Sequence, residues 1–329
     1  MNGRRILVTG VGGFVGRHLV RAILSGHDLS IGLGKRPAIP EVRAFLAEEY
    51  VADIRDAPKL AEAIAAARPD AVIHLAGQSS VGRSFENPIE TFEKNANGTW
   101  NLLEAIRIAA PQARVVCVGS ADVYGPQPEG ARVREDAALR PVSPYGLSKV
   151  LADSTAEFYS VKFGLDLVRT RSFAHIGPGQ ADHFVVPALA RQIAEIEAKK
   201  REPVLRVGNL DVTRDLTDVT SVAAGYLALL KRGRTGGVYN VCSGQAVKLS
   251  DLARRLIQRA RVEVRIDVDP ERMRPADIPY LVGDPGAIAR DTGWEAVAHL
   301  DQSLDEILDE WRAWSHDPGH GHADRSLQV

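Results

Sequence analysis

The stretch RILVTGVGGFVG, residues 5–16, decides the fold. A short aliphatic run ends at Thr9, and Gly10, Gly13 and Gly16 follow at three-residue spacing before an amphipathic pattern that continues to residue 27. A strand, a glycine-rich turn and a helix in this order are typical of the first unit of a dinucleotide-binding fold. Glycine lets the backbone turn tightly and approach a diphosphate, and the N-terminus of the following helix offers free N–H groups to it.

Strand-like and helix-like segments alternate from this stretch to residue 173. The predicted strands cover residues 5–10, 29–34, 48–54, 70–77, 113–120 and 165–173. The predicted helices cover residues 14–27, 57–69, 91–110 and 143–164. This alternation predicts an α/β fold with a Rossmann-like, doubly wound parallel sheet and right-handed crossovers.

The alternation weakens after residue 174. A helix is predicted over residues 184–200, a short strand over 203–208, a helix that ends at 232, and one more sheet strand over 236–243. We therefore expect residues 1–174, with about 215–243, to form the dinucleotide-binding domain. Residues 175–214 and 244–315 then form a smaller mixed α/β lobe that binds substrate. Residues 316–329 have little apolar content and are predicted to be a disordered tail.

The composition excludes several other classes of protein. The 329 residues are 45% hydrophobic and 25% charged, and the formal net charge is −1. This balance predicts neither a nucleic-acid nor a membrane partner, and the chain begins a strand at once instead of a signal peptide. The two cysteines, Cys117 and Cys242, make neither a disulfide framework nor a paired-cysteine metal site. We expect a cytoplasmic enzyme without a bound metal.

The end of the second predicted strand bears on the choice of dinucleotide. An NAD site usually has an acidic residue there, but this chain has Lys35 and Arg36. Two cations suit the 2′-phosphate of NADP(H), which we favour, although solvated loop charges and NAD(H) remain open. Asp53 and Ile54, at the end of the third strand, are placed to bracket the adenine.

Three further residues carry the chemistry. Ser120 ends the fifth predicted strand, and Tyr145 and Lys149 would share one face of the next helix, because they lie four residues apart. A nearby ammonium favours the phenolate of a tyrosine, which brings the phenol toward the useful range for proton transfer. A glycine-rich turn, a strand-end serine and a YxxxK pair in this order resemble the extended short-chain dehydrogenase/reductase family of nucleotide-sugar enzymes. The resemblance covers about residues 4–312.

The resemblance implies a role for each of these residues. Tyr145 would exchange a proton with a sugar hydroxyl or ketone, Lys149 would hold the nicotinamide ribose, and Ser120 would orient the reacting oxygen. Asn95 would support the Lys149 ammonium through water. The implied cofactor contacts are Gly10, Gly13, Phe14, Val15, Gly16, Lys35, Arg36, Asp53, Ile54, Leu75, Ala76, Gly77, Asn95, Tyr145 and Lys149.

Four more segments resemble the GDP-sugar branch of that family. They are HLAGQSSVGRSFENP (74–88), HIGPGQ (175–180), RVGNLDVTRDLTDV (206–219) and RMRPADIPYLVGDP (272–285). The implied substrate contacts are Gln78, Ser79, Ser80, Asp122, His175, Val186, Arg191, Arg214 and Arg274. Arg214 and Arg274 would bind the diphosphate, although ion pairs with Asp215 or Asp277 are the alternative.

Three positions leave the substrate less defined. The family commonly has Asn where this chain has Ala174, and the following His175 is either a ligand contact or a packed histidine. Arg83 lines the sugar pocket or is a solvated loop residue. The implied partner is a GDP-linked deoxy-keto sugar.

The branch implies reduction of the 4-keto group of GDP-4-keto-6-deoxy-D-mannose to GDP-D-rhamnose, with hydride from nicotinamide and a proton from Tyr145. One alternative is a GDP-mannose 4,6-dehydratase or an epimerase that retains its cofactor; another is a non-catalytic dinucleotide sensor. Dehydratase relatives have Glu two residues after the strand-end Ser or Thr, where this chain has the shorter Asp122. Family members often dimerise through the two long helices, here 91–110 and 143–164.

Overall fold

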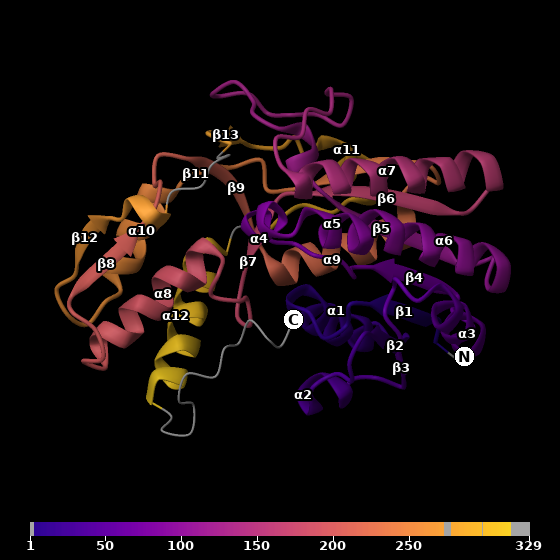
Figure 1. The fold of residues 1–329 in the computed structure, drawn as a ribbon, viewed down its shortest axis with the longest axis horizontal. Helices are drawn as coiled ribbons and strands as arrows, with labels where there is room; N and C mark the ends of the chain where they lie inside the picture. Colours follow the sequence, from indigo (N-terminus) through magenta and orange to yellow (C-terminus); the bar gives the residue numbers. More distant parts are fainter. Residues whose placement is uncertain (1–2, 273–277, 298, 317–329) are drawn as a thin grey trace.

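A seven-stranded parallel sheet forms the centre of the larger domain (Figure 1). The computed structural model describes residues 3–272, 278–297 and 299–316. The strand order is β10-β6-β5-β4-β1-β2-β3, so the winding reverses between β1 and β4. The strands are β1 (Arg5–Thr9), β2 (Leu29–Gly34), β3 (Glu48–Val51), β4 (Ala71–His74), β5 (Arg114–Ser120), β6 (Leu167–Ser172) and β10 (Val238–Val241). The predicted doubly wound parallel sheet is confirmed.

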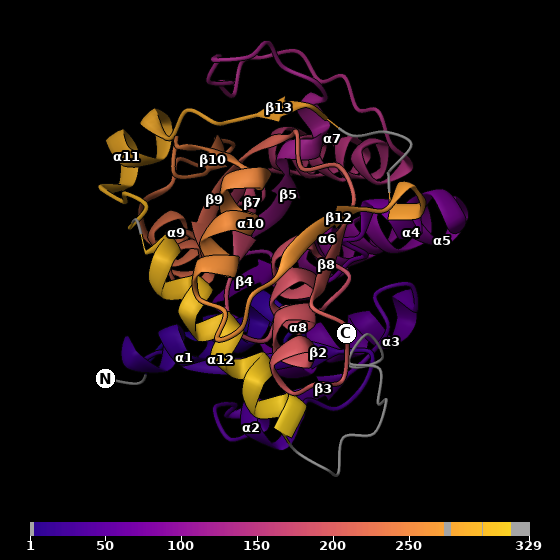
Figure 2. The same cartoon turned by 90° about the vertical axis from the view of Figure 1, so that its left-hand side faces the viewer.

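Helices cover both faces of this sheet, which explains why its strands are apolar on both sides. On β1, Ile6 and Val8 face one hydrophobic core, whereas Leu7 faces the other. Figure 2 shows α6 and α7 on one side of the sheet and α1 and α9 on the other. The covering helices are α1 (Phe14–Ser25), α3 (Ala57–Ala67), α6 (Gly98–Ala109), α7 (Pro144–Phe163), α9 (Val219–Arg232) and α11 (Gly286–Thr292). The sheet is therefore the middle of three layers.

The segment predicted as one helix over 91–110 is interrupted. Helix α5 (Pro88–Phe92) leads into a π-helix, η1 (Glu93–Asn97), before α6 begins at Gly98. Such wide turns concentrate at functional sites. In this turn the Asn95 side chain reaches inward and hydrogen-bonds the backbone of Gln78. The prediction of one continuous α-helix was therefore wrong over this turn.

The smaller lobe has its own sheets, helices and core (Figure 2). Its four-stranded sheet contains β7 (Ala174–Ile176), β9 (Thr213–Asp218), β11 (Ala246–Lys248) and β13 (Tyr280–Leu281), and a two-stranded sheet contains β8 (Val204–Val207) and β12 (Arg265–Val268). Its helices are α8 (Val185–Glu197), α10 (Leu249–Gln258) and α12 (Leu300–His316). Leucine, isoleucine and alanine side chains from the three helices pack into one core with β8.

The remaining short elements lie in connections. They are α2 (Pro40–Arg43), α4 (Val81–Glu86) and the 3-10 helices η2 (Ala121–Tyr124) and η3 (Pro270–Arg272). No helix within the described ranges is both long and apolar enough to cross a membrane. Apart from His316, the last residue of α12, the tail predicted to be disordered (316–329) lies outside the described residues.

Candidate active site

The turn between β1 and α1 has the geometry that a dinucleotide diphosphate needs. Gly10 adopts a left-handed conformation (φ +69°), and a Cβ there would lie 2.9 Å from the backbone of Ala76. A Cβ on Gly16 would collide with the carbonyl oxygen of Val11. Helix α1 begins after Gly13 with no side-chain cap and no acidic residue in its first turn. Its N-terminal N–H groups are therefore left for an anion, so this turn fits a dinucleotide.

The predicted catalytic residues lie together at the carboxyl end of β5. The Ser120 hydroxyl donates to Asp122 Oδ2 at 2.9 Å and is also hydrogen-bonded to the Tyr145 phenol. Lys149 Nζ donates to the carbonyl oxygen of Val118 at 3.2 Å. The fold thus joins residues from β5, η2 and α7 in one hydrogen-bonded group.

Burial controls the charge state of this group. Burial, followed by the negative charge of Asp122, raises the pKa of Tyr145, while its hydrogen bond with Ser120 opposes the rise. Burial also lowers the pKa of Lys149. The sequence argument expected the lysine to favour the phenolate, but in the structure the loss of hydration dominates. The phenol is therefore neutral at physiological pH and is set up to give a proton to a carbonyl oxygen.

Asn95 fixes the loop that follows β4. Its Nδ2 donates to Gln78 O at 3.0 Å and to Ser148 Oγ at 2.9 Å, and its Oδ1 accepts from Gln78 N at 2.7 Å. Ser148 Oγ in turn donates to Tyr145 O. The Gln78 amide donates to Thr91 Oγ1 at 3.2 Å and accepts from Ser80 N. Asn95 therefore braces the helix that bears Tyr145 directly, whereas a water-mediated contact with Lys149 stays a prediction.

A buried histidine that sequence reasoning missed links the same elements. His74, the last residue of β4, contacts Thr9 Oγ1 at 2.8 Å and Thr99 Oγ1 at 3.1 Å. Because the Thr99 hydroxyl donates to Asn95 O, the imidazole donates from Nε2 and accepts at Nδ1. Burial, and then the Lys149 charge, lower the pKa of His74 to about 3. A neutral ring thus joins β1, β4 and the start of α6. The only sequence signal was a histidine in an apolar strand.

The predicted adenine contacts lie at the ends of β2 and β3. Asp53 accepts from Arg55 Nη2 at 2.7 Å, and this hydrogen bond is the main reason that its pKa falls to about 2. Asp53 also lines a hollow of about 620 Å³ with Asn97, Trp100 and other residues. Lys35 and Arg36 are exposed just after β2, and Ile54 packs against Gly98. The predicted contacts Val15, Leu75 and Ala76 are partly buried against the two cores.

His175 is packed against the glycine-rich turn. Its ring stacks on Phe14 with centroids 5.9 Å apart, and its Nδ1 donates to Phe173 O at 3.0 Å. Burial lowers the pKa of this histidine. These contacts account for His175 as a packed residue beside the predicted cofactor position, and a direct ligand contact stays a prediction.

The predicted substrate residues of the lobe are more dispersed. Arg214 Nη1 donates to the carbonyl oxygens of Thr213 and Ile278, at 2.9 and 2.5 Å. Arg191 pairs with Asp182 and Glu195. Three further predicted contacts are placed as follows: Val186 in the lobe core, Ser79 exposed, and Ser80 at the N-cap of α4. Arg274 lies outside the described residues.

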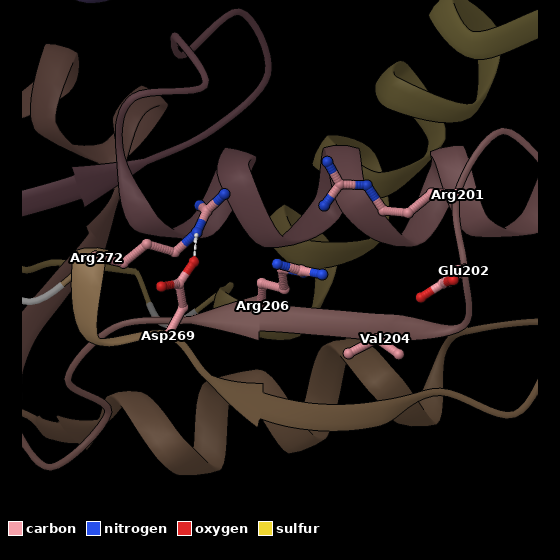
Figure 3. Close-up of a pocket in the computed structure, with 6 residues that line it drawn as sticks. All are labelled: Arg201, Glu202, Val204, Arg206, Asp269 and Arg272. Atoms are coloured by element: carbon pink, nitrogen blue, oxygen red, sulfur yellow. Dashed lines mark hydrogen bonds and ion pairs between the residues drawn. The ribbon is translucent and has the colours of Figure 1, made fainter.

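An arginine-lined pocket of about 380 Å³ lies elsewhere in the lobe (Figure 3). Arg201, Arg206 and Arg272 line it together with Glu202, Val204 and Asp269, and Arg272 Nε lies 3.3 Å from Asp269 Oδ2. None of the predicted catalytic or substrate residues lines this pocket. Its carboxylates neutralise much of its positive charge, so we do not assign the sugar nucleotide to it.

Comparisons with known proteins agree on one family. Residues 7–307 match the family model described as GDP-mannose 4,6 dehydratase. The chain is 38% identical over 311 residues to the GDP-6-deoxy-D-mannose reductase of Pseudomonas aeruginosa, covering 94% of this chain and 98% of that protein. The structure of RMD from Pseudomonas aeruginosa complexed with NADPH superposes with a TM-score of 0.83 at 36% identity, over 94% of this chain and 99% of that one. The Thermus thermophilus UDP-glucose 4-epimerase in complex with NAD also reaches 0.83, at 29% identity and the same coverage.

Proposed function

The chain belongs to the GDP-mannose 4,6-dehydratase family, and from this premise we propose that it is an NADPH-dependent reductase of GDP-4-keto-6-deoxy-D-mannose that forms GDP-D-rhamnose. The observation that carries the proposal is the hydrogen-bonded group of Ser120, Asp122 and Tyr145 beside Lys149. Its neutral phenol is the group that reduction of a ketone requires. The 38% identity to a reductase over 94% of the chain supports the same activity.

The residues of the chain bind, orient and protonate the ketone. Bound NADPH supplies the hydride that reduces C4. Tyr145 gives its proton to the C4 oxygen as negative charge develops there, and Ser120 holds that oxygen by a hydrogen bond. Lys149, with its ammonium at the end of β5, stabilises the phenolate that remains. The proton returns from solvent after the product leaves.

Asp122 favours reduction over dehydration in this proposal. Dehydration needs a base for the C5 proton and an acid for the C6 hydroxyl, in addition to the Ser–Tyr–Lys group. The Asp122 carboxylate is shorter than the glutamate of dehydratase relatives and accepts a hydrogen bond from Ser120 at 2.9 Å. Proton transfer requires heavy atoms within about 3 Å. A carboxylate that is hydrogen-bonded to the serine is therefore poorly placed to exchange a proton with C5 or with the C6 hydroxyl.

A two-substrate assay tests the proposal. Purified protein receives either GDP-4-keto-6-deoxy-D-mannose with NADPH or GDP-mannose with a trace of NADP⁺, and the products are followed by NMR. We expect one NADPH consumed per ketone converted and no change in GDP-mannose. A 4-keto-6-deoxy product from GDP-mannose without net cofactor turnover would instead establish the dehydratase alternative.

We assign the two ligands to different parts of the chain. Residues 1–174 and about 215–243 would bind NADP(H), through the glycine-rich turn and through Lys35 and Arg36. Residues 175–214 and 244–315 would bind the GDP-sugar, with Arg214 and Arg274 at the diphosphate. The NADPH complex of the Pseudomonas aeruginosa relative supports the cofactor assignment, and the NAD complex of the epimerase keeps NAD(H) as the alternative.

We further propose a cytoplasmic homodimer formed through α6 and α7. These adjacent helices expose aromatic side chains, among them Trp100 (48% exposed), Phe158 (42%) and Phe163 (47%). Exposed clusters of this kind are typical of protein interfaces. Light scattering after gel filtration should give the mass of a dimer, and Phe158→Glu should give a monomer. The two cysteines, both free and buried, are compatible with a reducing compartment.

A further inference from the structure

Four cations gather where the adenosine ribose of the cofactor is expected. Lys35 and Arg36 follow the last residue of β2, Arg83 lies on α4, and Lys94 lies in the π-helix η1. We call these four residues the cation cluster. Burial, and then the charges of Lys94, Arg36 and Arg83, lower the pKa of Lys35, so these three cations lie close enough to repel Lys35.

Contacts between the backbone elements place η1 against the ends of β2 and β3. The N–H of Ala52 donates to Gly34 O at 2.9 Å, which joins the two strand ends. Arg55, just after β3, lies 3.6 Å from Glu93 in η1. The start of α6 at Gly98 packs directly on Ile54. Lys94, the neighbour of Glu93, therefore sits at the same sheet edge as Lys35.

Glu90 holds Lys94 in this position. The Lys94 ammonium lies 2.6 Å from Glu90 Oε1, and Arg83 Nη2 lies 3.5 Å from the other oxygen of the same carboxylate. Only 14% of the Lys94 side chain is exposed. An ordered, mostly buried ammonium has already lost its conformational entropy in the folded protein. A solvated surface lysine loses it only when a ligand binds, so the ordered ammonium binds an anion at a lower entropic cost.

The charges around this point do not balance. The cation cluster and Arg55 bring five positive charges, against three carboxylates from Asp53, Glu90 and Glu93. A phosphate monoester, with a charge of about −2 near neutral pH, suits a place where cations outnumber carboxylates. Lys35 forms no hydrogen bond or ion pair with any residue in the described part of the chain. An anion bound between these cations would reduce their mutual repulsion.

We propose that Lys94, positioned by Glu90, completes the binding site for the 2′-phosphate of the cofactor with Lys35 and Arg36, and thereby selects NADP(H) over NAD(H). Arg83 adds positive charge at the outer side of the site. This inference rests on the proposed function and adds a specificity residue from the π-helix η1, outside the loop after β2.

Binding of the oxidised cofactors tests the role of Lys94 without turnover. NADP⁺ and NAD⁺ differ only in the 2′-phosphate, and calorimetry measures the dissociation constant of each for the wild type, Lys94→Met and Lys248→Met. Lys248, ion-paired with Asp211 in the lobe, is the control for loss of one paired lysine. We expect Lys94→Met to weaken NADP⁺ about 10- to 30-fold, the scale of one charge-assisted hydrogen bond, and to change NAD⁺ less than about threefold. Lys248→Met should change neither.

Other binding results would contradict either the role of Lys94 or the NADP(H) assignment. If the wild type prefers NADP⁺ and Lys94→Met keeps that preference, the inference about Lys94 is wrong and the proposed function stands. If Lys94→Met weakened the binding of NADP⁺ and NAD⁺ equally, the role of Lys94 would be structural and the inference would be wrong. Equal affinity of the wild type for NADP⁺ and NAD⁺ would overturn both the NADP(H) assignment and the role of Lys94. An equal loss of NADP⁺ affinity in Lys248→Met would show that the effect comes from net charge alone, and it would overturn the inference about Lys94.

Discussion

Replacing Asp122 by asparagine should move the pH profile of the reductase without abolishing its activity. The carboxylate and the Tyr145 phenol both hydrogen-bond the Ser120 hydroxyl. Asparagine keeps an oxygen that accepts from the serine, so Asp122→Asn removes the negative charge and leaves the hydrogen bond. Because an anion raises the pKa of a neighbouring phenol, its removal must lower that pKa.

The size of the pKa shift follows from the distance between the carboxylate and the phenol, which both hydrogen-bond Ser120. Two O–H···O bonds of ordinary length put the carboxylate about 5–6 Å from the phenol oxygen. Unit charges at that separation interact by roughly 3 kcal/mol at an effective dielectric constant of about 20, which is about two pH units. Asp122 is partly exposed, and solvent roughly halves this interaction. We therefore expect the alkaline limb of kcat/KM to move down by about one pH unit.

The assay follows kcat/KM with NADPH and the 4-keto sugar from about pH 6 to the highest pH at which both proteins remain folded. At pH 7 the phenol stays protonated in both proteins, so Asp122→Asn should retain the wild-type rate within about threefold. Asp251→Asn removes an exposed charge on α10 and serves as the control, because it lies in the lobe and should leave the profile unchanged. An alkaline limb that stays in place or moves upward would refute the coupling. A loss of more than about 100-fold at pH 7 would make Asp122 a catalytic acid.

Three further changes have defined outcomes. Tyr145→Phe should lower kcat by roughly 10²–10⁴ while calorimetry still detects cofactor binding, and a wild-type rate would require another proton donor. The double variant Lys35→Ala, Arg36→Ala should lose most of the NADPH preference in kcat/KM, and an unchanged NADPH/NADH ratio would exclude these two cations. Asp153→Asn should reduce the free energy of unfolding in urea by about 3–5 kcal/mol, because the buried carboxylate lies 3.3 Å from Arg169 and 3.1 Å from another buried guanidinium. A loss below about 1 kcal/mol would show that the arginines find other partners.

The central sheet could be predicted because its signal is local. Strands buried on both faces are continuous apolar runs, and the run over 29–34 coincides with β2, Leu29–Gly34. In the lobe, β8 (Val204–Val207) matches the strand predicted over 203–208, but two other strands carry no such signal. All four residues of β12 (Arg265–Val268) are exposed, and β11 (Ala246–Lys248) is only three residues long and pairs with a distant segment. Their existence depends on pairing across the chain, which periodicity does not report.

Some features of the candidate site could also be predicted from the sequence, whereas others could not. The order of the glycine-rich turn, Ser120, Tyr145 and Lys149 along the chain predicted their convergence, since parallel strands end at one edge. The π-turn at Glu93–Asn97 could not be predicted, because it depends on an inward hydrogen bond of Asn95. The protonation state of the Tyr145 phenol could also be inferred only from the structure. Its pKa depends on burial, and no spacing of residues reports how much water a fold removes.

The last strand of the central sheet constrains how the chain can fold during synthesis. Strand β10 pairs with β6 through Val238 and Arg169, so β6 remains an unpaired edge until the segment that bears β8 and β9 has been made. Unpaired edges of nascent sheets invite association with other chains, and parallel pairing over a long connection forms slowly. A chain that stops before residue 238 should therefore aggregate on the ribosome or soon after release. The two parts of the molecule are consequently one unit of biosynthesis, even though each surrounds its own core.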